Sequence, residues 1–282
     1  MFKHRFTYTN NRNETWEFGE SSGVYLDESN LFDYAWDAVT AQGRLAAVTR
    51  TAREIPVSLL FLLRERDAGR VNDFDDLIDY DCRMGKEGTL ELNGWQLPGV
   101  FASSAASEYQ WRPGLMRREM VFLATSPDWT RRTVQSFAAA SESSQGSLDF
   151  PHDFPHDWTA ANHLEQFHNP SAFPAQFLLR IYGPCDDPYV IIGGNTYQVA
   201  VHLSEGEQLV IDSMDHSQIL KVGVYGQATN VFDDATLGAP GSGDYIFEPI
   251  PPGSSALARS SGFRFDVELV ELRSTPRWYE EG

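Results

Sequence analysis

The stretch from Tyr245 to Trp278 constrains the fold more than any other part of the chain. It reads YIFEPIPPGSSALARSSGFRFDVELVELRSTPRW. In its second half, apolar residues alternate with charged ones at Phe263, Phe265, Val267 and Leu269. A period of two is typical of a β-strand with one buried face and one solvated face. The pattern therefore predicts a long closing strand.

The same stretch predicts what comes before this strand. Tyr245 to Ile250 is apolar enough for another strand, which Pro251 and Pro252 end because proline cannot donate a ladder hydrogen bond. Gly253 permits a sharp corner, and the small residues after it are expected to form a loop. The chain is therefore predicted to end in a β domain.

The length and net charge of the chain limit the classes of protein to which it can belong. The 282 residues, 41% of them hydrophobic, suffice for one large domain or two ordinary ones. The net charge is −18, of which residues 1–140 carry −4 and residues 141–282 carry −14. Without a basic stripe, this balance argues against a nucleic-acid partner. The acidic half suits solubility, or else a surface for a basic partner or a cation.

The environment of the chain can be bounded in the same way. Cys82 and Cys185 lie in opposite halves, which disfavours a disulfide framework and suits folding in a cytoplasm. The first residues lack the apolar core of a signal peptide. The longest apolar run, Ile55 to Leu63, is far too short to span a membrane and predicts a strand instead. We expect no membrane insertion.

The first half contains one convincing helix. Asn72 is a suitable N-cap, and Gly85 is a suitable end. The apolar face combines Phe74, Leu77 and Ile78 with Cys82, which predicts a buried, inert thiol. The helix is therefore predicted from Asn72 to Cys82.

Other segments of the first half are less uniform. Asn93-Gly94 is the strongest hairpin signal in the chain. Residues 24–39 fit a strand or a short helix equally well, and residues 40–54 fit an exposed arm or a weak helix. These two alternatives stay open.

Composition changes sharply between residues 138 and 172, where small residues, prolines and histidines replace the strand pattern. We therefore predict a first domain over 1–140, a linker over 141–172 and a second domain over 173–282. The last residues could pack back on the first domain. The second half shows about seven strands with frequent turn signals, which favours a sandwich or jelly-roll domain.

Histidines and carboxylates are the candidates for chemistry. His152 and His156 have a spacing known from metal sites, but Pro151 and Pro155 break a helix there and favour a rigid connector. The remaining candidates are interpreted as solvated residues: His163, His168, Asp75/Asp76, Asp186/Asp187, Asp233/Asp234 and the short Asp212–Asp215 fragment of a calcium loop. Nucleophile-elbow, phosphate-loop and dinucleotide motifs are absent. We assign no catalytic, cofactor-binding or metal-binding residue and expect no cofactor.

Glycan binding is a separate hypothesis, since β-sandwiches often hold sugars against an exposed aromatic ring. The candidates are Trp158, Tyr197, Tyr225 and Tyr245. Core packing is the preferred interpretation of each, because large aromatic side chains bury most of their surface.

The order of these segments resembles the distal tail protein family of long-tailed bacteriophages. The resemblance lies in IPVSLLFLL, NDFDDLIDYDC, GKEGTLELNGWQLPG, FLLRIYGPCDDPYVIIGG, TYQVAVHLSEGEQLVIDS and the ending IPPG…FRFDVELVELRSTPRW. It covers nearly the whole chain. The Pro- and His-rich stretch 151–168 departs from the pattern, its role is open, and no sugar-binding residue can be carried over.

The resemblance implies a mainly β protein with two parts. The N-terminal part would be a β-sandwich or split-barrel ring domain with one helix, and the C-terminal part a galectin-like β-sandwich. The first domains of about six copies would close a ring at the distal end of the virion tail, with residues 40–54 reaching a neighbouring subunit. Such a ring is a non-enzymatic hub, made in the host bacterial cytoplasm. It contacts the tail tube protein, tail-tip proteins and receptor-binding or fibre proteins.

Three hypotheses remain in order of preference: the tail-tip ring, a free-standing carbohydrate-binding protein that recognises host surface glycans, and a glycan-degrading enzyme. Fold analogy alone cannot choose among them.

Overall fold

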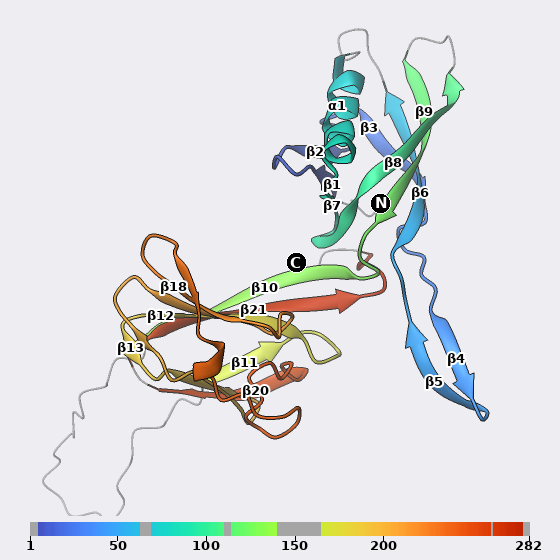
Figure 1. The fold of residues 1–282 in the computed structure, drawn as a ribbon. Coiled ribbons are helices and arrows are strands. Elements are labelled where there is room, and N and C mark those ends of the chain that lie inside the picture. Colours follow the sequence, from blue (N-terminus) through green and yellow to red (C-terminus); the bar gives the residue numbers. More distant parts are fainter. Residues whose placement is uncertain (1–4, 63–68, 110–113, 140–164, 261, 279–282) are drawn as a thin grey trace, which may run out of the picture. The chain divides into compact units, whose positions relative to one another are not determined.

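The computed structural model describes residues 5–62, 69–109, 114–139, 165–260 and 262–278. This part of the chain is mainly β, with one α-helix and antiparallel sheets, as predicted. It divides into two compact units (Figure 1). Unit 1 comprises Met1–Arg131 with Leu272–Gly282, and unit 2 comprises Arg132–Glu271.

Unit 1 is built on one antiparallel sheet with the strand order β2-β1-β7-β8-β9-β6-β3. The bounds are β1 Phe6–Thr9, β2 Thr15–Phe18, β3 Val24–Ser29, β6 Arg53–Leu62, β7 Gly88–Leu92, β8 Trp95–Tyr109 and β9 Leu115–Ala124. A single bridge between Gly19 and Val24 joins the ends of the two outermost strands. The sheet therefore almost closes on itself as a split barrel.

The core of unit 1 is rich in aromatic rings. Val57, Leu59 and Phe61 are buried at alternate positions of β6, as a period of two requires. The rings of Phe61 and Phe101 lie 5.8 and 6.2 Å from the ring of Phe74 on the helix. Burying such a side chain contributes roughly 1.5–3 kcal/mol, so these contacts hold the helix against the barrel.

The helix α1 spans Gly69–Met84 and so begins three residues before the predicted start. Asn72 lies inside it, and the predicted N-cap is wrong because the helical hydrogen-bonding pattern continues further toward the N-terminus. Gly85 ends the helix with a φ of 61°, as predicted. Within the described ranges, no helix combines the length and apolar character needed to cross a membrane.

The predicted burial of Cys82 is also wrong. Cys82 is exposed, and the buried residue in this turn is Asp81. Asp81 follows Phe74 by seven residues, close to two full turns, so it lies nearer the middle of the apolar face than Cys82 does. A carboxylate occupies a position where a sequence pattern predicts an apolar side chain.

Two other local predictions can be compared directly. Asn93 and Gly94 have φ values of 53° and 77° between β7 and β8, which confirms the tight turn. The undecided segment 24–39 forms β3 and the beginning of β4. The strand alternative for that segment is therefore confirmed, and the short-helix alternative is wrong.

The segment 40–54 is an exposed arm, and the helix alternative is wrong. Strands β4, Asp37–Ala41, and β5, Arg44–Thr49, pair as a two-stranded hairpin that projects from the barrel of unit 1 (Figure 1). Its turn at Gln42 and Gly43 has φ values of 53° and 74°, which is the geometry of a tight hairpin turn.

The last residues of the chain belong to unit 1, where three contacts hold them. The Asn93 side-chain amide donates to the main-chain oxygen of Arg277 at 2.9 Å. The rings of Phe32 and Trp278 stack at 3.8 Å with an interplanar angle of 3°. The Arg273 guanidinium lies 5.5 Å from the centre of the Trp95 ring. The segment 273–278 is therefore packed against unit 1.

Unit 2 is a β-sandwich. One sheet has the order β19-β18-β17-β12-β21-β10, the other β11-β20-β14-β15, and a β13-β16 pair adds to them. The bounds are β10 Trp129–Phe137, β11 Glu165–Asn169, β12 Gln176–Tyr182, β13 Cys185–Asp186, β14 Tyr189–Ile192, β15 Asn195–Gln198, β16 His202–Leu203, β17 Gln208–Asp212, β18 Ile219–Val222, β19 Ala228–Asn230, β20 Gly253–Arg259, β21 Arg264–Arg273 and the 3₁₀ turn η2 Phe232–Asp234. Buried residues of both sheets form one core.

The closing strand β21 confirms the alternation seen in the sequence, since Phe265, Val267 and Leu269 are fully buried. The segment before it differs from the prediction. Tyr245–Ile250 forms turns and one isolated bridge instead of a strand, because Pro249 within it and Pro251 directly after it interrupt ladder pairing. The small-residue segment predicted as a loop is strand β20, which fits between β11 and β14.

The unit boundary lies elsewhere than the predicted domain limits. Unit 2 begins at Arg132, whereas the second domain is expected from residue 173, and β11 falls inside the range 141–172 expected as linker. Each residue of β11 pairs with β20, so β11 is part of the sandwich. Residues 140–164 lie outside the described ranges. The extents of functional domains within the chain stay a prediction.

Candidate subunit interface

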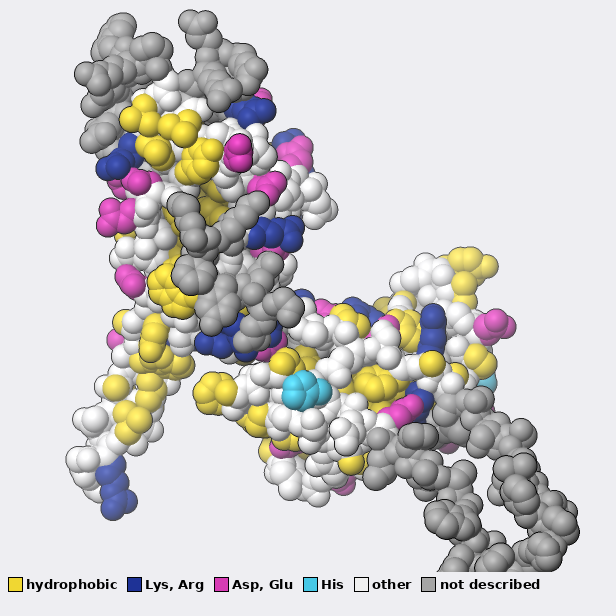
Figure 2. All heavy atoms as spheres, turned by 180° about the vertical axis from the view of Figure 1, so that it is seen from behind, with side chains coloured by type: hydrophobic (Ala, Val, Ile, Leu, Met, Phe, Trp, Pro, Cys, Tyr) yellow, Lys and Arg dark blue, Asp and Glu magenta, His cyan; other side chains and the backbone are white. Residues whose placement is uncertain are grey.

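The β4–β5 hairpin is an exposed feature of unit 1, since every one of its strand residues is exposed. Val39, Leu45 and Val48 are 57%, 64% and 39% exposed. The register pairs Ala38 with Val48 and Val39 with Ala47, so adjacent pairs present apolar groups on both faces. Figure 2 shows hydrophobic side chains along this arm. Because an isolated hairpin is at best marginally stable in water, it suits packing against another chain.

The base of the hairpin is anchored by two arginines. Arg50 lies over the ring of Trp36, 4.3 Å from its centre, and forms an ion pair with Asp128. Only 7% of the Arg50 side chain is exposed. Desolvation by burial lowers the pKa of Arg50, although a guanidinium stays protonated at neutral pH. Arg53 donates to the main-chain oxygen of Asp33. These contacts fix the direction in which the hairpin leaves the barrel.

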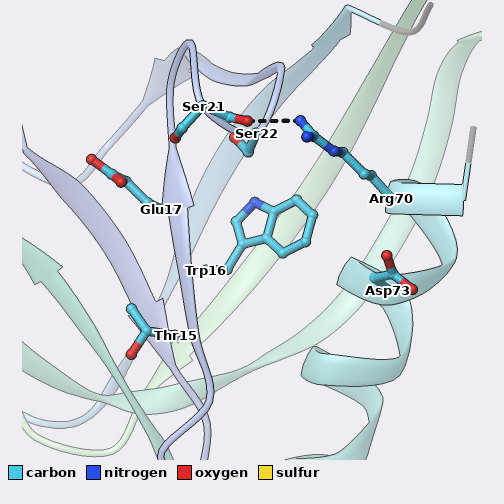
Figure 3. A pocket seen from close by; sticks show the side chains of 7 residues that line it. All are labelled: Thr15, Trp16, Glu17, Ser21, Ser22, Arg70 and Asp73. Atoms are coloured by element: carbon cyan, nitrogen blue, oxygen red, sulfur yellow. Dashed lines mark hydrogen bonds between the residues drawn. The ribbon is translucent and has the colours of Figure 1, made fainter. Parts of the chain in front are cut away.

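A shallow, open hollow between β2 and α1 is the second candidate surface, with a volume of about 240 Å³ (Figure 3). Trp16 and Glu17 line it from β2, and Arg70 and Asp73 line it from α1. Nη1 of Arg70 donates to the main-chain oxygen of Ser21 at 2.7 Å, which ties the helix to the turn after β2. An aromatic ring among carboxylates and hydroxyls can hold a polypeptide segment or a sugar.

The aromatic residues predicted for glycan binding fall in different environments. Tyr197 is buried and donates its hydroxyl to the main-chain oxygen of Glu248 at 2.7 Å, so it is a core residue. Tyr245 is half-buried and packs edge-on to Phe247. Tyr225 is 96% exposed in the turn between β18 and β19. Trp158 lies outside the described residues. The structure does not bring these candidates together.

The predicted histidine cluster cannot be assembled from the described residues. His152, His156 and His163 lie outside them, and His168 is an exposed residue of β11 with Nδ1 3.3 Å from the Ser254 hydroxyl. Across the described ranges, no group of three or more His, Cys, Asp or Glu side chains is arranged to hold a metal ion.

The adjacent carboxylate pairs engage separate partners. Asp75 forms an ion pair with Arg118 at 2.5 Å on unit 1, and Asp233 and Asp234 belong to η2 on unit 2. In the suspected calcium-loop fragment, hydrogen bonds from Ser217 hold the pKa of Asp215 below its usual range. The carboxylate oxygens there are used within their own loop.

Sequence analysis missed a short chain of hydrogen-bonding groups on unit 2. Oδ1 of Asp186 lies 2.5 Å from Nδ1 of His202, and Nε2 of His202 lies 3.4 Å from Oγ of Ser204. The side chains of His202 and Asp186 are 66% and 81% exposed. These residue types occur in hydrolases, but such a relay works in a site that excludes water. Here it is a surface hydrogen-bond chain.

A buried polar pair beneath α1 was missed as well. The Tyr8 hydroxyl donates to Oδ2 of Asp81 at 2.6 Å, and the main-chain N–H of Asn11 donates to Oδ1 at 2.8 Å. Burial, followed by the hydrogen bond to Asp81, raises the pKa of Tyr8. A Cβ on Gly88 would lie 2.5 Å from the Tyr8 hydroxyl oxygen, which explains the glycine beside this pair. These contacts fix α1, and with it one wall of the hollow.

The fold is shared with hub and baseplate proteins of phage tails. The Dit protein of phage SPP1, described as a paradigm of the hub adsorption apparatus in phages that infect Gram-positive hosts, has a TM-score of 0.57 and 11% identity. That match covers 95% of this chain and 99% of that one. Two structures of the phage P2 baseplate in its activated conformation, with Ca and with Sr, have TM-scores of 0.54 and 0.55. Both are 15% identical and cover 97% of this chain and 100% of the other.

Comparison with protein-family models and with curated proteins found no match. At these identities the structural similarity establishes a common fold over nearly the whole chain. It confirms the fold expected from the resemblance to distal tail proteins.

Proposed function

We propose that this chain is a structural, non-enzymatic component of a bacteriophage tail that forms a ring at the distal end of the tail tube. The observation that carries the proposal is the fold, which matches phage hub and baseplate chains over 95–97% of this chain. A match of both units at once is more specific than a match of one β-sandwich, which many unrelated functions share.

Unit 1 supplies the features that a ring requires. The β4–β5 hairpin exposes apolar groups on both faces and is anchored only at its base. A ring uses head-to-tail contacts that close after a fixed number of rotations, and we propose about six copies from the resemblance. An arm exchanged between neighbours would bury its apolar side chains and supply a contact of this kind.

Unit 2 would carry the contacts outside the ring. We propose that it docks tail-tip, fibre or receptor-binding proteins, while unit 1 meets the tail tube protein. The acidic character of residues 141–282, with a net charge of −14, suits a soluble surface that associates with basic patches on partners.

A galectin-like sandwich that binds host glycans is the second candidate function, favoured by one observation. Tyr225 is 96% exposed in a tight turn, a position where it can stack on a sugar ring. If a glycan array detects binding that is lost in Tyr225→Ala, this second function is supported.

The full chain tests the proposal. We expect averaged electron micrographs of the purified protein to show rings of about six subunits with a central opening. The appropriate control is a variant at an exposed site on unit 2, Tyr225→Ala, which should leave the rings unchanged. A protein that stays monomeric alone and with tail tube protein would contradict the proposal.

A further inference from the structure

The strand β19 of unit 2 has an open outer edge. It ends one sheet of the sandwich and pairs with β18 along one side, and no strand in the described part of the chain pairs with the other side. The main-chain N–H of Val231 donates to the oxygen of Ile219 at 2.8 Å, which fixes the hydrogen-bonded positions of the ladder. Because these positions alternate in an antiparallel pair, Thr229 bonds to β18, whereas the main-chain groups of Ala228 and Asn230 point away from it.

Two other edges of the sandwich are covered by the chain itself. At β11, the side-chain amide of Gln135 donates to the main-chain oxygen of His168 at 2.6 Å and accepts from its N–H at 3.3 Å. At β15, the N–H of Thr196 donates to the main-chain oxygen of Gly243 at 2.9 Å. The sandwich therefore satisfies the outward main-chain groups at these edges and leaves those of β19 without a protein partner among the described residues.

The edge of β19 is accessible as well as unpaired. All three of its residues, Ala228, Thr229 and Asn230, are exposed and carry small side chains. Natural proteins protect an edge with lysine, proline, a bulge or a short strand. Of these devices β19 has only its short length, since it contains neither lysine nor proline and its register with β18 is regular. A partner strand that pairs here needs further contacts at the two ends of β19.

The first end of β19 offers an apolar contact. In the turn that leads from β18 into β19, Val224 and Tyr225 are 61% and 96% exposed. The turn is held by a hydrogen bond from the N–H of Gly226 to the oxygen of Gly223 at 2.9 Å. The side-chain oxygen of Gln227 accepts from the N–H of Tyr225 at 3.2 Å. A preformed turn presents the tyrosine at little ordering cost, and tyrosine is a frequent anchor of protein interfaces.

The second end of β19 is acidic. Asp233 and Asp234 follow the strand in η2, and both are exposed. Their position is fixed by Oδ1 of Asn230, which accepts from the N–H groups of Ile219 and Phe232 at 3.1 Å each. The two carboxylates favour a basic side chain in whatever lies beside this end.

We infer that β19 accepts an extended segment of a tail-tip, fibre or receptor-binding protein as an additional antiparallel strand. The segment enters with a basic residue beside Asp233 and Asp234, pairs with the outward main-chain groups of β19, and leaves with an apolar residue against Tyr225. A second copy of this chain is a poor occupant, because residues 141–282 carry a net charge of −14 and would repel each other. This inference rests on the proposed function and identifies the surface of unit 2 that docks the partner.

Hydrogen exchange in the full chain tests the docking site. The tail-tip, fibre and receptor-binding proteins of the phage are each mixed separately with the full chain. We expect the amides of Ala228 and Asn230 to exchange rapidly in the free chain and slowly in the complex, while the amide of Thr229 is protected in both. This alternation distinguishes the addition of a strand from simple covering of the surface.

Substitutions on the edge provide a second readout. Ala228→Pro removes an outward N–H without breaking a bond to β18, and proline is tolerated at such edge positions. We expect it to weaken the complex about tenfold. The matched control Ala228→Ser keeps the N–H and should bind like the native chain. Asp233→Lys combined with Asp234→Lys should also weaken binding about tenfold and reduce its dependence on salt. All these variants should form the same rings, because the changes lie on unit 2.

The possible failures are distinguishable. Complexes in which Ala228 and Asn230 stay unprotected would overturn the docking site while leaving the proposed function intact, and so would rings that bind none of these proteins. Equal affinities of Ala228→Pro and Ala228→Ser would overturn it as well. Glycan binding that is lost in Tyr225→Ala, in a chain that binds none of the proteins, would overturn it in favour of the second candidate function. A chain that forms neither rings nor complexes would overturn both the docking site and the proposed function.

Discussion

The Tyr8 hydroxyl donates a 2.6 Å hydrogen bond to Oδ2 of Asp81 in the core of unit 1, between the first strand and the only α-helix in the described residues. The pair is separated by 73 residues in the chain. Its geometry determines how α1 lies on the barrel, and α1 forms one wall of the hollow beside β2. The wall of the hollow thus depends on a buried contact that does not itself reach the surface.

Removing this hydrogen bond should destabilise unit 1 without changing its surface. Tyr8→Phe leaves the Asp81 carboxylate buried without its donor, which should cost about 1–3 kcal/mol in the free energy of unfolding. Urea denaturation measures this loss. Asp81→Asn serves as the partner variant, and the double variant should lose less than the sum of the two single variants. Strict additivity would show that the two groups do not interact.

The same pair predicts a loss of stability in alkali. Burial raises the pKa of Tyr8 above its ordinary value in the folded protein, so folding favours the protonated phenol. The resulting stability is complete below the unfolded pKa of about 10 and decreases as pH rises above it. Thermal unfolding between neutral pH and pH 11 should show a steeper alkaline decline in the native chain than in Tyr8→Phe. Equal slopes would contradict the assignment.

The contacts of Glu268 predict that unit 2 loses stability in acid. Desolvation raises its pKa, but hydrogen bonds from Arg132 and Arg180, at 2.9 and 3.1 Å, outweigh burial and lower the pKa overall. The stability from this lowered pKa is present above the unfolded value of about 4.3 and is lost as pH falls through the folded value.

Glu268→Gln should therefore flatten the acid limb of the stability curve and cost about 1.5–3 kcal/mol near neutral pH. The comparison requires urea titrations at several pH values. Asp233→Asn is a useful control, because Asp233 is an exposed residue of η2. A similar acid limb in native and Glu268→Gln proteins would exclude a role for the Glu268 pair.

The hairpin should be dispensable for folding. Its strand residues are all exposed, so replacing residues 37–49 by a short Gly-Ser linker removes no core side chain. We expect the free energy of unfolding to change by less than about 1 kcal/mol. Circular dichroism with urea denaturation measures this. A large loss of stability would show that the arm packs on its own chain in solution.

Sequence patterns predicted the regular parts of the fold and missed what tertiary contacts decide. The alternation of apolar and charged residues predicted β21. Asn93-Gly94 predicted a hairpin, because both residues readily adopt the positive φ of a tight turn. Asp81 departs from the pattern, because a carboxylate can be buried only where another group donates a hydrogen bond to it. Here the donor is the Tyr8 hydroxyl, which is far away in the sequence. β20 was missed because its small residues carry little strand propensity of their own and depend on β11 and β14 for pairing.

The candidate interface was only partly predictable for the same reason. The lack of a clean period in residues 40–54 fitted an exposed arm or a weak helix, and the exposure of the segment's strand residues decides for the arm. The hollow could not be foreseen. It requires Trp16 and Asp73 to meet across β2 and α1, and no local spacing in the sequence encodes that approach.

The mass of the protein in solution tests the central claim most directly. Light scattering should be measured over a wide concentration range for the native chain and for the variant that lacks residues 37–49. We predict an assembly of about six subunits for the native chain and a monomer for the variant, because head-to-tail closure requires the arm. A variant that assembles to the same mass as the native chain would contradict the account, because the ring would then close without the arm.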